Sequence, residues 1–274
     1  MYTSRSSQNR LYALCGERLL GAVSYNGYRA YVFPLYTPKG VLVLQESPPD
    51  HPHHQGIMVG QDLVNGHNFW AILHPGHPLN RQVRAANFAA EADQRGLTVS
   101  AELCWQAADG ERVLDEQRTV RFESWEECTF VEVTSTWKAT YGPVHVAQTK
   151  EGGLGMRVHQ QLEAEWGGVI RSSNGDTGEA GIFDTTAAWI EVSGRIGPND
   201  AGIVMMPHPS ASPVPWFCRN YGLHLYGPVR HAPLSLPPGG EYTLRVGFAA
   251  YDGTSEGGTV AAAIYSKYLK RSGA

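Results

Sequence analysis

The chain has 274 residues, of which 42% are hydrophobic and 18% charged, and its formal net charge is −4. This composition supplies a large apolar core and excludes a disordered chain. Lysines and arginines form no run or stripe, so the sequence lacks the electrostatic footprint of a nucleic-acid-binding protein. The 31 glycines and 17 prolines are spread along the chain, which is typical of many short strands joined by turns.

The N-terminal stretch Met1–Arg10 is polar and has no apolar core of a signal peptide. Apolar runs such as Val41–Leu44 are far shorter than the roughly 20 residues of a membrane span, so no membrane association is expected. None of the four cysteines lies in a CxxC pair, which favours reduced thiols and a cytoplasmic protein. These cysteines are Cys15, Cys104, Cys128 and Cys218.

Alternation of apolar and polar residues with a period of two recurs along the chain and predicts half-buried antiparallel strands. The clearest runs are Leu97–Trp105, Val131–Trp137, Ala188–Arg195 and Tyr242–Phe248. Sheets of such strands must cover each other's apolar faces. The sequence therefore predicts an all-β fold, a large antiparallel β-sandwich.

Turn residues separate the strands, as at Ala107–Gly110 and Pro237–Gly240. One short C-terminal helix is predicted, because apolar residues from Val260 to Tyr268 share one helical face and lysines lie near its end. No repeat or linker interrupts the pattern, so residues 1–274 are expected to form a single domain.

The first stretch that does not resemble a strand is a histidine-rich loop. Four of the 11 histidines lie between Asp50 and His67. Neutral imidazole is a good metal ligand, and a pKa near 6.5 suits general acid or base catalysis. His53 and His54 are therefore candidate catalytic residues. The candidate metal ligands are His51, His53 and His54, and the candidate sugar-binding residues nearby are Asn65 and Trp70. The alternative is a loop whose histidines only fix local structure.

A second stretch places Lys150 and Glu151 directly before paired glycines, with Arg157 on the strand-like run that follows. The lysine and the glutamate are candidate catalytic groups, and the arginine is a candidate substrate-binding residue. Glu151 would act as a general base or a metal ligand. The alternative is a surface salt bridge, which contributes about 0–1 kcal/mol.

Two later stretches complete the candidate site. Asn174 precedes a glycine, so it either forms a plain hairpin turn or donates its amide to a ligand hydroxyl. His208 lies between two prolines that stiffen its backbone and is a further catalytic candidate. Trp216 and Tyr221 are candidates for stacking on a sugar ring, and Arg219 for pairing with a ligand oxygen. Alternatively, Trp216 is a core residue.

These blocks resemble the PmoA-like family, from the multi-histidine run His51–Gly56 through the segments around Glu151 and Asn174 to His208–Gly222. The resemblance implies a galactose-mutarotase-like β-sandwich and a role in carbohydrate metabolism. A membrane methane oxygenase subunit, to which the family name refers, needs transmembrane helices that this sequence lacks. Gln55 departs from the family pattern, which more often has arginine at this position.

Three functions stay open on the sequence alone. The first is an enzyme acting on a sugar or keto-sugar as an epimerase, lyase or hydrolase, with a histidine as acid and Glu151 as base. The second is an enzyme that uses a divalent metal held by histidine and glutamate. The third is a non-catalytic carbohydrate-binding domain. In each case the expected partner is a carbohydrate-like small molecule.

Overall fold

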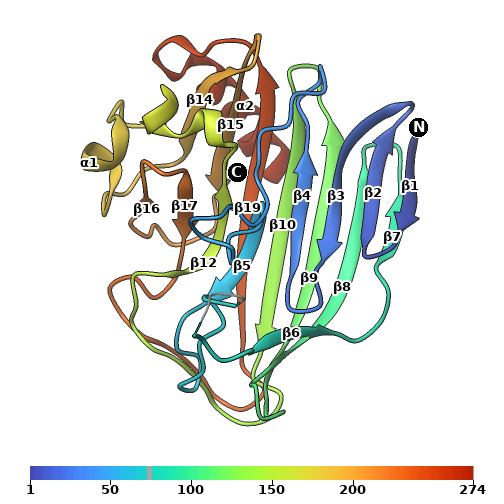
Figure 1. Ribbon diagram of the computed structural model, residues 1–274, viewed down its shortest axis with the longest axis vertical. Helices are drawn as coiled ribbons and strands as arrows, with labels where there is room; N and C mark the ends of the chain where they lie inside the picture. The colour runs from blue at the N-terminus through green and yellow to red at the C-terminus, as the bar shows by residue number, and fades with distance from the viewer. Residues whose placement is uncertain (73–75, 274) are drawn as a thin grey trace.

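The computed structural model describes residues 1–72 and 76–273, and in this part of the chain two antiparallel sheets face each other (Figure 1). The first sheet has eight strands. In their order across the sheet they are β1 (Tyr2–Ser7), β2 (Arg10–Cys15), β3 (Arg18–Tyr25), β4 (Ala30–Leu35), β5 (Ile57–Gln61), β12 (Gly152–Arg157), β17 (Leu223–Tyr226) and β16 (Phe217–Cys218).

The second sheet has nine strands, one of which, β7 (Ala89–Ala92), pairs only with β8. The others, in their order across the sheet, are β13 (Val169–Ser172), β14 (Ile190–Ile196), β15 (Asn199–Pro207), β19 (Glu241–Asp252), β10 (Cys128–Lys138), β9 (Arg112–Ser124), β8 (Leu97–Gln106) and β6 (Arg81–Arg84). A separate pair consists of β11 (Val144–Val146) and β18 (Leu234–Leu236).

Helices are few in the described residues. A five-residue helix, α1 (Gly178–Ile182), was not predicted, whereas α2 (Thr259–Ser272) is the predicted C-terminal helix. Three short 3-10 helices cover Gln160–Leu162, Ala164–Trp166 and Glu256–Gly258. No helix among residues 1–72 and 76–273 is long and apolar enough to cross a membrane.

The predicted strands and sandwich are confirmed. In β8 every second residue from Leu97 to Trp105 is buried, as the period of two requires. These side chains pack between the sheets, where the rings of Trp105 and Trp137 lie 5.3 Å apart. The apolar faces of both sheets therefore form one core.

A buried ion pair inside this core has no counterpart in the sequence prediction. Arg118 donates from Nε to Glu116 at 2.6 Å, and both side chains are almost fully buried. Ser135 and Trp105 also donate to the Glu116 carboxylate. These hydrogen bonds compensate for the desolvation of the two charges.

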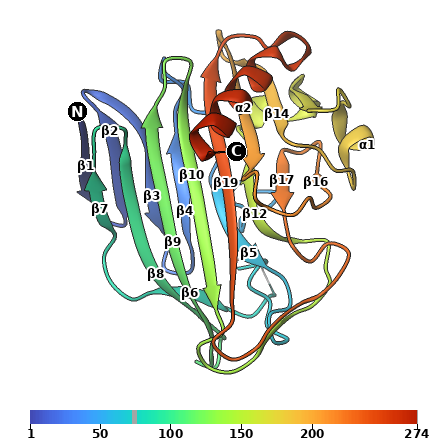
Figure 2. The same ribbon diagram turned by 180° about the vertical axis from the view of Figure 1, so that it is seen from behind.

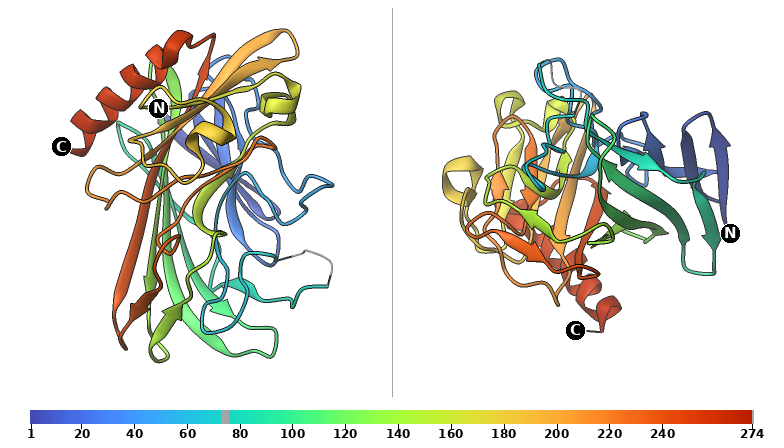
Figure 3. Two further views of the ribbon diagram at one scale, coloured as in Figure 1. Left: turned by 90° about the vertical axis from the view of Figure 1, so that its left-hand side faces the viewer. Right: turned by 90° about the horizontal axis from the view of Figure 1, so that it is seen from below.

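The two outer faces of the sandwich differ. Helix α2 lies across the outer face of the nine-stranded sheet, where Ile264 and Tyr268 pack on Phe130 (Figure 2). The outer face of the eight-stranded sheet has an aromatic and aliphatic cluster of its own, which includes Met58 and Trp70. The long loop that follows β4 lies on the side of the molecule opposite α2 (Figure 3). The histidine-rich segment belongs to this loop.

Candidate functional site

Local backbone geometry folds the histidine-rich loop back onto its own sheet. The amide of Ser47 donates to the carbonyl of His54 at 2.8 Å, which closes the loop. Gly56 ends it with φ of +49°, and a Cβ there would lie 2.1 Å from the carbonyl oxygen of Val32. Only glycine fits this combination of positive φ and close approach. The histidines are therefore held in place at both ends of the loop.

His51 forms a pair with the neighbouring carboxylate. Its Nδ1 lies 2.7 Å from Oδ2 of Asp50, and the two side chains are 33% and 47% exposed. Partial burial raises the pKa of Asp50, but hydrogen bonds from His51 and Arg157 outweigh this and lower it below its usual value. Asp50 is thus a stable anion that orients the imidazole.

The ring of His51 lies between two nearly parallel rings, those of His54 and Tyr221. His51 stacks on His54 with ring centroids 4.6 Å apart and on Tyr221 with centroids 4.8 Å apart. The ring planes deviate by 5° and 10°, respectively. The stack restricts the rotation of His51, so its free nitrogen has a defined direction.

Arg157, at the end of β12, joins the loop to the rest of the sheet. Its Nη2 donates to Asp50 Oδ2 and to Glu163 Oε1, both at 2.9 Å, and its Nη1 lies 3.3 Å from Nδ1 of His54. Its guanidinium also lies over the ring of Tyr221, 5.1 Å from the centroid. This predicted substrate-binding residue is buried, with a side chain only 2% exposed, and organises the cluster.

His54 is neutral in this position. Burial lowers its pKa far below the usual value, and the charges of His53, His51, Arg157 and Arg29 act in the same direction. Because arginine only donates, Nδ1 of His54 must accept, and the proton resides on Nε2. His54 therefore serves as a hydrogen-bond donor at neutral pH.

Arg29 is a buried cation that sequence reasoning missed. It donates to the backbone carbonyls of His53, Phe69 and Trp70 at 3.0, 2.7 and 2.9 Å. Burial, followed by the nearby charge of Arg118, lowers the pKa of Arg29 to about 9. The residue ties the histidine loop to the segment of Trp70. Nothing in its local sequence indicated this role.

The candidate metal ligands, His51, His53 and His54, lie in one loop. Among residues 1–72 and 76–273, no three His, Cys, Asp or Glu side chains are grouped to hold a metal ion. Imidazole lone pairs lie in the ring plane, so the stacked rings of His51 and His54 direct them along parallel planes rather than to one point. No step of a mechanism is therefore assigned to a metal.

Glu151, the candidate base, has only an electrostatic effect on one residue of this cluster. Its charge contributes to the raised pKa of Tyr221, which burial raises to about 12 with smaller electrostatic effects from several groups. Its side chain is 35% exposed, and Nζ of Lys150 lies 3.8 Å from its carboxylate. The glutamate directly precedes β12, at the opposite end of this strand from Arg157, and the lysine is exposed.

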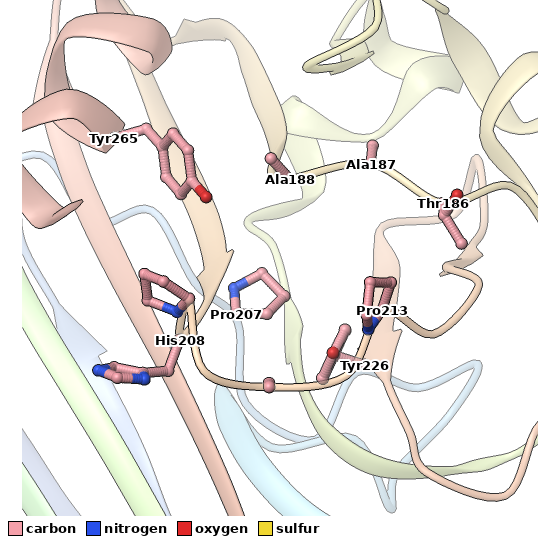
Figure 4. Close-up of a pocket in the computed structure, with 10 residues that line it drawn as sticks. Thr186, Ala187, Ala188, Pro207, His208, Pro213, Tyr226 and Tyr265 are labelled. Atoms are coloured by element: carbon pink, nitrogen blue, oxygen red, sulfur yellow. The ribbon is translucent and has the colours of Figure 1, made fainter. Parts of the chain in front are cut away.

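His208 lies away from the histidine-rich loop. It follows β15 and packs edge-on against Tyr268 of α2, on the outer face opposite the histidine loop. With Tyr265 and Tyr226 it lines a separate cavity of about 320 Å³ (Figure 4). Its Nδ1 accepts from the backbone amide of Ser210. The four predicted stretches therefore do not form a single site.

Three further predicted binding residues have structural contacts. Trp216 is fully buried and donates to the carbonyl of Ala187, which matches its core alternative. Asn65 donates a side-chain hydrogen bond to the carbonyl of Pro143 and Asn174 donates one to the carbonyl of Thr186, so each joins its loop to another segment. Trp216 cannot stack on a sugar, because it is buried in the core of the sandwich.

Arg219 is only partly buried, but it too has partners within the chain. Its guanidinium pairs with Glu179 of α1 and lies over the rings of Phe183 and Phe217, 4.6 and 4.8 Å from their centroids. These contacts are sufficient to explain its orientation without a ligand.

Acid is expected to destabilise the protein through its buried histidines. His224 is fully buried between the sheets, and burial, with a smaller effect of Arg157, lowers its pKa to about 3. In the unfolded chain both His224 and His54 have a pKa near 6.5, so below this pH unfolding takes up protons. Each group should lower the free energy of unfolding by about 1.4 kcal/mol per pH unit below about pH 6.5.

Urea denaturation at pH 7.5, 6.5 and 5.5 measures this slope. The variant His224→Gln should reduce the slope by one proton, whereas His145→Gln, at an exposed histidine, should not change it. A free energy of unfolding that stays constant over this range would contradict the prediction.

Comparison with known proteins identifies the family. A model of a family of unknown function, DUF6807, matches residues 18–265. The chain belongs to this family. No curated protein sequence matches it significantly.

Two solved structures resemble the chain at low identity. One is an Escherichia coli K12 protein described as "Putative aldose 1-epimerase", with 8% identity, 92% of this chain and 99% of that chain covered, and a TM-score of 0.41. The other is a galactose mutarotase-like protein from Lactobacillus casei ATCC 334, with 11% identity, 92% and 100% covered, and a TM-score of 0.34. Likenesses this distant carry no argument about a reaction.

Proposed function

We propose that the chain is a carbohydrate-active enzyme that transfers protons to or from a sugar or keto-sugar, as an epimerase, lyase or hydrolase does. One observation supports this most directly: His51 is partly exposed, held by the Asp50 carboxylate at 2.7 Å, and fixed by ring stacking. The resemblance to PmoA-like proteins supports the carbohydrate class. A cytoplasmic location is part of the same proposal.

His51 is the acid–base group in this proposal. Asp50 accepts the proton of Nδ1, which leaves the lone pair of Nε2 to remove a proton from a sugar hydroxyl. The imidazolium that forms is stabilised by the Asp50 anion. A positioned general base of this kind contributes typically about 10²–10⁴-fold to the rate.

Glu151 and Tyr221 complete the proposed site. In this proposal the glutamate supplies the second carboxylate, and its charge is one of several smaller effects on the pKa of Tyr221. Tyrosine presents an apolar face and a polar hydroxyl, which suits the mixed surface of a sugar. The buried His54 positions His51 by stacking and does not need to change its charge.

Non-catalytic carbohydrate binding is the second candidate. The burial of His53 and His54, which are 5% and 1% exposed, favours it, because groups so covered have little access to a substrate. In that case the exposed groups Asp50 and His51 would only donate and accept hydrogen bonds.

A screen of the purified protein tests the proposal. Neutral aldoses would be followed by NMR for exchange between anomers, keto-sugars for elimination, and glycosides for hydrolysis. Saturable acceleration of one reaction is the expected result. Thermal stabilisation by sugars with no reaction would favour the binding alternative, and neither effect with any sugar would overturn the proposal.

A further inference from the structure

A second polar cavity lies on the eight-stranded sheet, over β2 to β4, away from His51. Its volume is about 300 Å³. It is lined by Ser7, Gln8, Asn9, Arg10, Tyr12, Ser24, Tyr25 and Tyr31. The β1–β2 hairpin forms one wall, where Gln8 and Asn9 are exposed, and β4 supplies the buried Tyr31. The cavity therefore has a rigid floor and an accessible rim.

The positive charge of Arg10 in this cavity is balanced by the neighbouring carboxylate of Glu46. Nη2 of Arg10 donates to both oxygens of Glu46, at 2.9 and 2.7 Å. The hydroxyl of Tyr31 donates to the same carboxylate at 2.6 Å. A cation paired in this way does not select an anion, so the lining favours a neutral ligand.

The chemistry of the lining indicates a ligand rich in hydroxyl groups. Carboxamides, hydroxyls and an ion pair offer both donors and acceptors, which match the hydroxyls of a sugar. Tyr12 adds an aromatic face for the apolar face of a sugar ring. A purely apolar ligand would leave these polar groups without partners.

The cavity is separate from the histidine cluster, although one carboxylate connects the two. Glu46 forms a β-bridge with Gln55, so it stands at the base of the histidine loop. The cavity is centred over β3, which is three strands from β12 and Arg157. Neighbouring strands lie about 4.8 Å apart, which separates the two regions by roughly 14 Å.

We propose that this cavity is a second carbohydrate-binding site that takes one neutral sugar unit. Arg10 and Tyr31 bind its hydroxyls, Glu46 outside the lining holds both of them in place, and Tyr12 packs on its ring. The inference goes beyond the proposed function and does not depend on it, since no residue of the Asp50–His51 pair lines this cavity.

Saturation-transfer NMR with glucose, cellobiose, maltose and glucuronate tests the proposal. At least one neutral sugar should bind, and Tyr12→Ala should weaken its binding at least tenfold, with a smaller loss in Asn9→Ala. The variant His51→Ala should retain this binding. Tyr265→Ala, in the cavity on the opposite face, is the matched control and should also bind normally.

Each of the other possible results would contradict a specific part of the proposal. Binding to His51→Ala that survives the addition of Tyr12→Ala and Asn9→Ala would overturn the second site, and loss of binding in His51→Ala alone would leave only the histidine site. Preferential binding of glucuronate would overturn the neutral ligand class. If no sugar of the set binds to the folded protein, the second site is wrong, whereas the proposed function would still be decided by the activity screen.

Discussion

Replacing Arg157 with methionine is expected to lower the free energy of unfolding by about 3–5 kcal/mol, the usual cost of removing one partner from a buried ion pair. The guanidinium neutralises Glu163, whose side chain is 8% exposed, and donates to Asp50. After the substitution, Glu163 keeps the hydrogen bond from Gln45 but has lost its counter-charge. Urea denaturation at pH 7.5 measures the loss.

Arg219→Met is the matched control for this experiment. Arg219 also pairs with a glutamate and lies over aromatic rings, but both of its ion-pair side chains are about a quarter exposed. Its removal should cost about 0–1 kcal/mol, the range of exposed pairs. Adding Glu163→Gln to Arg157→Met should recover part of the stability. Equal effects of the two arginine substitutions would show that burial of the Arg157 pair has no energetic consequence.

Replacing His51 with alanine is expected to reduce turnover about 10²–10⁴-fold on the sugar that the screen identifies, because the general base is lost. Stability should change little, since the imidazole is one-third exposed. Asp50→Asn should also reduce turnover, because an amide does not stabilise the imidazolium. Initial rates of anomer exchange or elimination measure both effects.

His67→Ala is the control for general effects of removing a histidine. His67 also pairs with a carboxylate, that of Glu111 at 3.2 Å, on a different loop. Its variant should keep full activity. Unchanged turnover in His51→Ala would rule out His51 as the acid–base group, and Glu151→Gln would then be the next variant to measure.

Much of the fold was predictable because strand periodicity is a local property. The alternation in the sequence predicts β8, β10, β14 and β19, and each run contains its own signal. Of these four strands only β8 alternates in burial along its length, whereas β10, β14 and β19 have stretches that are buried on both faces. The short helix α1 was missed because five residues give too little helical periodicity. The single-domain organisation stays a prediction.

The candidate site was predictable only in part. The histidine loop, Arg157 and Tyr221 were identified and do lie together, whereas Asp50 was overlooked as a site residue. His208 was grouped with the loop, yet it lies on the opposite outer face. A sequence motif shows which residue types are present, but it does not show on which face of the sandwich they lie.

The sequence by itself determined four of the long strands, the C-terminal helix and the position of the histidine-rich loop. Only the tertiary structure decided that Arg157 meets Asp50 across 107 residues, that Arg29 is buried against backbone carbonyls, and that Trp216 is inaccessible. The reason is physical: side-chain periodicity depends on adjacent residues, but the pairing of β5 with β12 depends on the folding of the whole chain.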